Sequence, residues 1–123
     1  MVVDSNIVIA YLADDTEVIK LLTEWRQSGR PLFLSTVVEA EVLSFSGWST
    51  AERYHAEAFL EENFTSIPFD RTVARLAAEL RAKTKIKFPD AAIAATAIAT
   101  RTPLMTRNIK DFKRIPDLQV VTI

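Results

Sequence analysis

Hydrophobic residues along the chain fall into short blocks separated by small polar residues, prolines or glycines. Short apolar runs bounded by such breaks are typical of strands. Five of them predict strands or extended segments, with helical patterns in between. The five are Met1–Asp4, Leu32–Ser35, Ser66–Phe69, Leu104–Thr106 and Leu118–Thr122.

The segments between these blocks carry apolar residues at helical spacing. One helix starts at the acidic run Asp14–Glu17 and is stopped near Gly29. Ser49 and Glu52 form a capping-box pattern at the start of another. A third, Asp90–Arg101, is almost entirely Ala, Ile and Thr, which predicts a buried helix. The capping-box helix is expected to reach about Asn63, and the remaining helices are expected over Ile7–Leu12, Val37–Phe45 and Arg71–Lys83.

Strands that alternate with helices predict an α/β fold with a mainly parallel sheet of four or five strands, covered on both faces. The length of 123 residues is that of one domain, so we expect residues 1–123 to form a single unit. No apolar run approaches the roughly 18 residues that cross a bilayer. The N-terminus also lacks a signal-peptide pattern, and we expect a cytoplasmic protein.

Acidic and amide residues follow the predicted strands. They lie at the carboxyl ends of these strands, where functional residues of parallel sheets are usually found. Asp4 ends the first strand, and Glu41 lies in the opening turns of the helix after the second. Asn108 and Asp111 follow the fourth strand, and Asp90 opens the buried helix. We therefore expect four carboxylates to converge at one edge of the sheet. Taken singly, each acid has another interpretation, as a helix cap or a solvated charge.

The composition excludes most other catalytic chemistries. The chain has no cysteine and one histidine, His55, which excludes thiolate sites and multi-histidine metal sites. Its two glycines are isolated and form no phosphate-binding loop. Carboxylates must therefore carry any chemistry, and a site of oxygen ligands suits Mg²⁺ or Mn²⁺. Since such an ion polarises phosphoryl oxygens and activates water, the natural substrate is a phosphodiester.

Charge is unevenly distributed along the chain. Residues 1–70 hold four Lys/Arg and twelve Asp/Glu, net −8, whereas residues 71–123 hold eleven and four, net +7, which together give −1. Such asymmetry indicates a polyanionic partner, or charges that simply intermix on the folded surface. Basic residues precede Asp90 and surround Asp111, Arg114 among them. The candidates for phosphate contact are Lys85, Lys87, Arg107 and Lys110. Phe88 and Phe112, beside these clusters, are candidates for stacking on bases, but we expect them instead to anchor the core.

Four segments occur in order along the chain: V-V-D-S-N, S-T-V-V-E-A-E-V-L, P-D-A-A-I-A-A-T-A and T-R-N-I-K-D-F. Together they resemble the PIN domain family, in particular its VapC-type toxins, over essentially the whole chain. The resemblance implies a three-layer α/β/α fold and an Mg²⁺- or Mn²⁺-dependent endoribonuclease. The basic residues named above then become candidate RNA contacts.

The resemblance also implies roles for individual residues. Asp4, Glu41 and Asp90 match the acidic residues of the first three motifs, with Glu39 as a less well-spaced alternative to Glu41. The expected catalytic residues, which also bind metal, are Asp4, Glu41, Asp90 and Asp111.

The fourth position of the family pattern is open between two residues. Many PIN domains place an acid directly after T-R, where this chain has Asn108, and Asp111 follows three residues later. Both are therefore candidate metal contacts. Ser5, which matches the hydroxyl residue that commonly follows the first acid, and Thr106 are expected to support the site.

Partners are implied as well. VapC-type toxins are typically dimeric and are inhibited by a cognate antitoxin that binds across the active-site groove. We therefore expect an RNA substrate, an antitoxin and a homodimer, with its interface over the helical region Trp48–Phe64. One alternative is a PIN-fold module that binds RNA or protein without cleaving, which the neutral Asn108 would fit. A phospho-accepting receiver domain is disfavoured, because Asp14 and Asp15 follow a helical stretch instead of a strand.

Overall fold

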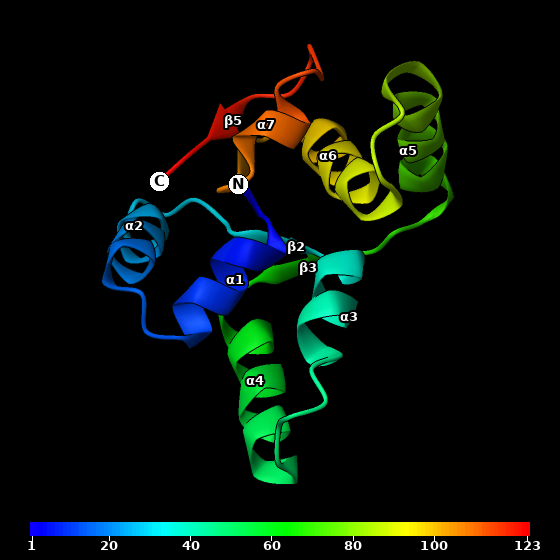
Figure 1. Cartoon of the computed structure of the whole chain (residues 1–123). Helices are drawn as coiled ribbons and strands as arrows, with labels where there is room; N and C mark the ends of the chain where they lie inside the picture. The colour runs from blue at the N-terminus through cyan, green and yellow to red at the C-terminus, as the bar shows by residue number, and fades with distance from the viewer.

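The computed structural model describes residues 1–123 and contains five strands and seven helices (Figure 1). All strand pairs are parallel, in the order β3-β2-β1-β4-β5. The predicted α/β fold with a mainly parallel sheet is confirmed. The elements are β1 (Val2–Val3), α1 (Ser5–Leu12), α2 (Thr16–Gln27), β2 (Phe33–Ser35), α3 (Thr36–Leu43), α4 (Thr50–Asn63), β3 (Thr65–Ile67), α5 (Arg71–Thr84), α6 (Phe88–Thr100), β4 (Leu104–Met105), α7 (Ile109–Phe112) and β5 (Val120–Val121).

Strand order explains how the helices are distributed. From β1 the chain moves outward to β2 and β3, and then returns to the other side of β1 to form β4 and β5. Because crossovers between parallel strands are right-handed, opposite directions of travel place the connecting helices on opposite faces of the sheet. In Figure 1, α5, α6 and α7 accordingly lie in the upper part of the view, and α1, α3 and α4 lie below them. The direction reverses between β1 and β4, and residues at the carboxyl ends of these strands lie where such sheets bind ligands.

Two helix starts show how local sequence sets the boundaries. At α4 the Ser49 hydroxyl accepts from the Glu52 N–H, and the Glu52 carboxylate accepts from the Ser49 N–H, so the predicted capping box forms. At α6 the helix begins at Phe88, two residues before the predicted Asp90. Pro89 favours this start, because the first turn of a helix leaves backbone N–H groups unpaired and proline has none. Asp90 is therefore the third residue of α6.

The core consists of 25 buried hydrophobic residues, five of which come from α6: Ala91, Ile93, Ala94, Ala95 and Ala97. Residues 91–97 of α6 are all buried, as predicted for this segment. Phe112 is fully buried, as expected for a core residue. It lies in the short helix α7, and the sequence pattern did not predict this helix. Phe88 is 46% exposed and packs edge-on against Phe69, so the expectation that it anchors the core is wrong. None of the helices combines the length and hydrophobicity needed to span a bilayer.

Candidate active site

Asp4 follows β1 directly and is the N-cap of α1. The residue is 4% exposed, and both of its carboxylate oxygens accept hydrogen bonds. Oδ1 accepts from the Ser5 backbone N–H at 2.7 Å and from the Ser5 hydroxyl at 3.4 Å. Oδ2 accepts from the Thr106 hydroxyl at 2.7 Å. The helix-cap and active-site interpretations of Asp4 are therefore compatible, because the bonds that cap α1 also fix the orientation of the carboxylate.

Thr106 connects this carboxylate to the segment that follows β4. The residue is fully buried, and its hydroxyl accepts from the Asn108 backbone N–H at 3.0 Å while it donates to Asp4. The side chain of Asn6 also reaches this hydroxyl, at 3.5 Å, and accepts from the Arg107 backbone N–H at 3.4 Å. Sequence reasoning assigned no role to Asn6, although it is the third residue of the D-S-N motif. Pairing of β1 with β4 thus brings the first and last motifs together.

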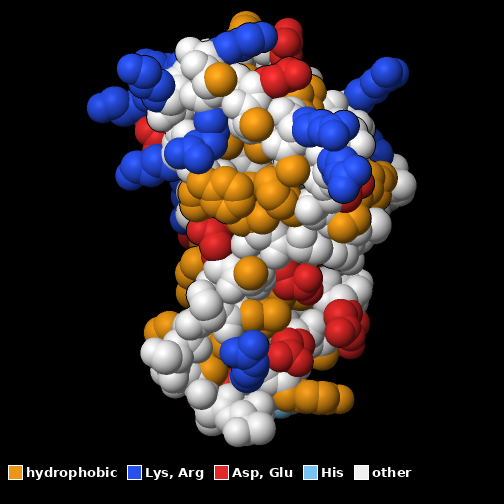
Figure 2. Space-filling model, turned by 90° about the vertical axis from the view of Figure 1, so that its right-hand side faces the viewer, with side chains coloured by type: hydrophobic (Ala, Val, Ile, Leu, Met, Phe, Trp, Pro, Cys, Tyr) orange, Lys and Arg blue, Asp and Glu red, His pale blue; other side chains and the backbone are white.

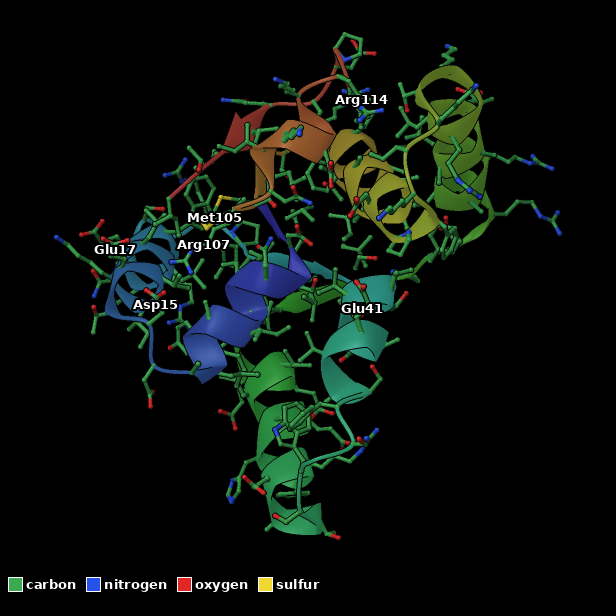
Figure 3. All side chains as sticks on the ribbon, in the orientation of Figure 1. Asp15, Glu17, Glu41, Met105, Arg107 and Arg114 are labelled. Atoms are coloured by element: carbon green, nitrogen blue, oxygen red, sulfur yellow. The ribbon has the colours of Figure 1, made fainter.

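Glu41, from α3, and Asp90, from α6, lie near Asp4, because the charge of Asp4 acts on both of them and α3 packs against α1 and α6. Figure 3 labels Glu41 on α3. Loss of hydration is the largest cause that raises the pKa of Glu41, followed by the charges of Asp4 and Asp90. The pKa of Glu41 is raised although much of this residue is exposed to solvent. The pKa of Asp90 is also raised, first by loss of hydration and then by the charges of Asp4 and Asp111. The positive charge of Lys87 lowers it.

The structure therefore brings the four predicted acids, Asp4, Glu41, Asp90 and Asp111, to one edge of the sheet. Glu39 instead borders a separate surface depression with Thr36, Leu43 and Arg53. The catalytic and metal-binding roles of these residues stay predictions, but the geometry favours Glu41 over Glu39.

Asn108 and Asp111 are in direct contact. The Asn108 side-chain amide donates to Asp111 Oδ2 at 2.7 Å, and its backbone N–H donates to Thr106. A continuous series of hydrogen bonds thus runs from Asp4 through Thr106 and Asn108 to Asp111. Asn108 and Asp111 therefore belong to the same site, where the Asn108 amide holds the Asp111 carboxylate in place.

The donor set fits a hard divalent cation. As the side chains are placed, no three acidic or histidine groups are close enough together to hold one ion between them. Mg²⁺ commonly uses only one or two carboxylates and keeps several water ligands, so it does not need a closed cage. Carboxylates that raise one another's pKa are also the groups that a cation relieves of their mutual repulsion. The raised pKa values of Glu41 and Asp90 are therefore consistent with a site that takes Mg²⁺ or Mn²⁺.

The four basic residues expected to contact phosphate occupy different surroundings. Lys85 and Lys87 line a pocket beside Asp90 and Asp111. Lys110 is exposed on α7. Arg107 forms an ion pair of 2.8 Å with Asp15 at the start of α2, and this contact lowers the pKa of Asp15. Figure 3 shows Arg107 on the α2 side of the molecule, beside Asp15 and away from Glu41.

Charged side chains are segregated on one face of the molecule. Figure 2 shows Lys and Arg gathered mainly over its upper half and acids mainly over its lower half, with hydrophobic side chains exposed between them. This pattern matches the charge difference between residues 1–70 and residues 71–123. On this face the opposite charges remain largely separate, which favours the interpretation of a polyanionic partner.

A pH dependence follows from the acidic cluster. Because the pKa values of Glu41 and Asp90 are raised above those of the unfolded chain, the folded protein binds protons more tightly. In metal-free solution the contribution of these two acids to the free energy of unfolding should therefore rise as the pH falls from neutrality through the raised pKa values. The Met1 amino group, whose pKa is lowered to about 6, acts in the opposite direction, so the effect of Glu41 is isolated by comparing a variant with the wild type. Glu41→Gln removes one of these charges, so its Tm should exceed that of the wild type most at neutral pH. Thermal unfolding of both proteins between about pH 7.5 and about pH 5 checks this, and a difference in Tm independent of pH would contradict it.

Fold and site together define the class of this molecule. It is a small doubly wound α/β protein with a cluster of carboxylates at the carboxyl ends of its parallel strands. The chain belongs to the PIN domain family, whose model matches residues 1–118.

The chain is similar to named members of this family. Ribonuclease VapC1 of Rickettsia felis is 34% identical over 134 aligned positions, which cover 100% of this chain and 96% of that protein. A toxin–antitoxin complex from Klebsiella pneumoniae contains a chain that is 34% identical, with a TM-score of 0.77 over 98% of this chain and 95% of that one. VapBC2 of Rickettsia felis, bound to a DNA fragment from its promoter, has a TM-score of 0.86 at 25% identity, over 99% and 97% of the two chains.

Proposed function

We propose that this protein is a VapC-type endoribonuclease toxin that depends on Mg²⁺ or Mn²⁺. The observation that carries the proposal is the convergence of Asp4, Glu41, Asp90 and Asp111, two of which have raised pKa values because of loss of hydration and, after it, their acidic neighbours. A soluble fold gains no stability from such repulsion, so the cluster points to a cation and a reaction. The full-length similarity to a protein named as a ribonuclease supports RNA as the substrate.

Each residue of the cluster has a definable task. A divalent ion bound there would polarise a phosphoryl oxygen and make a water molecule easier to deprotonate. Asp4 and Asp90 would hold that ion, and the hydrogen bonds of Asp4 to Ser5 and Thr106 fix its orientation. The carboxylate of Glu41 has a raised pKa, which suits it to accept a proton from the attacking water. Asp111, held by the Asn108 amide, would add a fourth negative charge to the acidic cluster around the ion.

An apolar groove beside the acidic cluster supports an antitoxin partner. The groove has a volume of about 470 Å³ and is lined by Ile9, Leu12, Ala13, Glu41, Val42, Ser44, Phe45 and Trp48. Ile9 is 54% exposed and Phe45 59% exposed, which is unusual for side chains of this size. We infer that an apolar segment of the antitoxin covers this groove and blocks access to Glu41. Complexes of toxin with antitoxin among the similar structures favour such a partner.

We also propose that the protein forms a homodimer. Tyr54, on α4, is 70% exposed, and α4 belongs to the region that the sequence suggested as an interface. Light scattering coupled to size-exclusion chromatography tests this directly. A dimer that Tyr54→Ser converts to a monomer supports the α4 interface, whereas a dimer that persists in that variant contradicts it.

The experiment that tests the proposed function measures cleavage of single-stranded RNA by the purified chain with Mg²⁺ or Mn²⁺. Cleavage is expected, and it should stop when a cognate antitoxin is added. Phe45→Ser should weaken inhibition by the antitoxin about tenfold or more, because a large apolar contact is lost from the groove. Absence of cleavage under all conditions would contradict the proposal, and unchanged inhibition of Phe45→Ser would contradict the role of the groove.

A further inference from the structure

A smaller pocket adjoins the acidic cluster on the side of α5 and α6. Its volume is about 150 Å³, and its lining residues are Lys85, Ile86, Lys87, Asp90, Asp111 and Arg114. Two of these are carboxylates of the candidate active site, and three are cations. The volume is about ten times the roughly 15 Å³ that a single water molecule needs, so a group as large as a phosphate can enter.

The three cations of this pocket have no close acidic partner. The molecule contains two ion pairs, Arg53 with Glu57 and Arg107 with Asp15, and neither involves a residue of the pocket. Lys85, Lys87 and Arg114 therefore line the pocket without a carboxylate within 4.0 Å of their charged nitrogen atoms. Their charge remains available to an anion from outside the chain.

Side-chain to backbone bonds hold the loop that presents these cations. The Arg81 Nε–H donates to the carbonyl oxygen of Ile86 at 3.2 Å, and Arg114 Nη1 donates to the carbonyl oxygen of Thr84 at 3.2 Å. Ile86 itself is buried, with 4% exposure. Lys85 ends α5 in the left-handed region at φ 58°, which turns the chain sharply towards α6. The wall of the pocket is therefore held in place directly before Lys85 and between the two lysines.

We propose that this pocket binds the RNA phosphate adjacent to the one that is cleaved. The inference rests on the proposed function, since the cleaved phosphate must reach the cation-binding carboxylates that include the buried Asp4. The pocket extends from that cluster only on the side of Asp90 and Asp111. RNA carries a negative charge at every nucleotide, so the strand that enters the site brings a second phosphate with it. The guanidinium of Arg114 suits phosphate oxygens, and the two lysines add positive charge.

The proposal is tested by removing charge from the protein, from the RNA, and from both together. The double variant Lys85→Asn with Lys87→Gln removes both lysine charges, and asparagine is tolerated in the left-handed region at residue 85. The control is Lys83→Gln with Lys113→Gln, which removes the same charge from exposed residues outside the pocket. Thermal unfolding checks that both variants fold.

The RNA probes are copies of a short single strand that the wild type cuts at one position. Each copy carries one uncharged methylphosphonate linkage next to the cut, on its 5′ or its 3′ side, and an unmodified copy serves as reference. The rate constant kcat/KM is measured with Mg²⁺, and the affinity is measured with Ca²⁺ at several salt concentrations.

For the wild type and the control variant, one of the two uncharged linkages should lower kcat/KM about tenfold. In the double lysine variant the same linkage should have almost no effect, because the contact is already lost. The dependence of log affinity on log salt concentration should become shallower by about 0.7, as expected for one phosphate of a single strand.

Two results would overturn the inference. Uncharged linkages that act equally in the wild type and the double variant, with no loss of kcat/KM on the unmodified probe, would show that the lysines do not contact a neighbouring phosphate. A double variant that loses the same factor on every probe, whichever linkage is uncharged, would place the cations at the cleaved phosphate instead. If the wild type cuts no RNA at all, the proposed function fails, and the salt dependence of affinity alone then decides whether the pocket takes a phosphate.

Discussion

Replacement of Asp90 by asparagine is expected to lower kcat/KM for RNA at least about a hundredfold. Asparagine keeps the size of the side chain but removes the negative charge that would hold the divalent ion. Asp90 contributes through position as well as charge, because it lies in the first turn of the buried helix α6, next to Asp4 and Asp111. The loss should appear in single-turnover cleavage rates at saturating Mg²⁺.

The same substitution should not lower stability in metal-free buffer. The pKa of Asp90 is raised by loss of hydration and by the charges of Asp4 and Asp111, so its ionised form is unfavourable in the folded protein. A neutral side chain relieves that cost, and Tm should stay equal or rise. Asp117→Asn is the matched control, since Asp117 is exposed and borders a different pocket. Lost activity together with a large fall in Tm would indicate that Asp90 is structural.

Phe112→Ala should destabilise the fold by about 3–5 kcal/mol, because it leaves a cavity the size of an aromatic ring. Phe112 is completely buried and comes directly after Asp111 in α7. A typical domain is stable by only about 5–15 kcal/mol, so the variant should be close to unfolding at moderate temperature. Urea denaturation followed by circular dichroism measures the effect.

Phe88→Ala is the control for this substitution, since Phe88 is the same residue type and is 46% exposed. It should cost roughly 1 kcal/mol or less, as surface substitutions usually do. Similar denaturation midpoints for the two variants would contradict the assignment of Phe112 to the core.

Much of this architecture could be predicted from local sequence pattern. Asp4 directly follows an apolar strand, and strand-end topology alone placed it at the functional edge of the sheet. The alanine-rich segment 91–97 could only be a buried helix, and the Ser49–Glu52 box marks a helix start by its spacing. These features are determined by residues close together in the chain.

Features that depend on contacts between distant segments could not be predicted in this way. Arg107 pairs with Asp15 across 92 positions of sequence, and no local pattern indicates that partner. The neutral Asn108 looked like a missing acid until its amide was found to hold Asp111. Phe88 looked like core because it is large and apolar, but its place at the first residue of α6 leaves it half-exposed. Tertiary context determines each of these cases.

We propose that Asp4 and Asp90, within the cluster of carboxylates at the carboxyl ends of the strands, hold a divalent ion with which this chain cleaves RNA. One measurement tests it most directly: cleavage of single-stranded RNA by the wild type and by the double variant Asp4→Asn with Asp90→Asn, with Mg²⁺ or Mn²⁺ and after addition of EDTA. We predict that only the wild type cleaves, that EDTA stops it, and that added metal restores it. Equal cleavage by the two proteins, or cleavage by the wild type that persists in EDTA, would contradict the account.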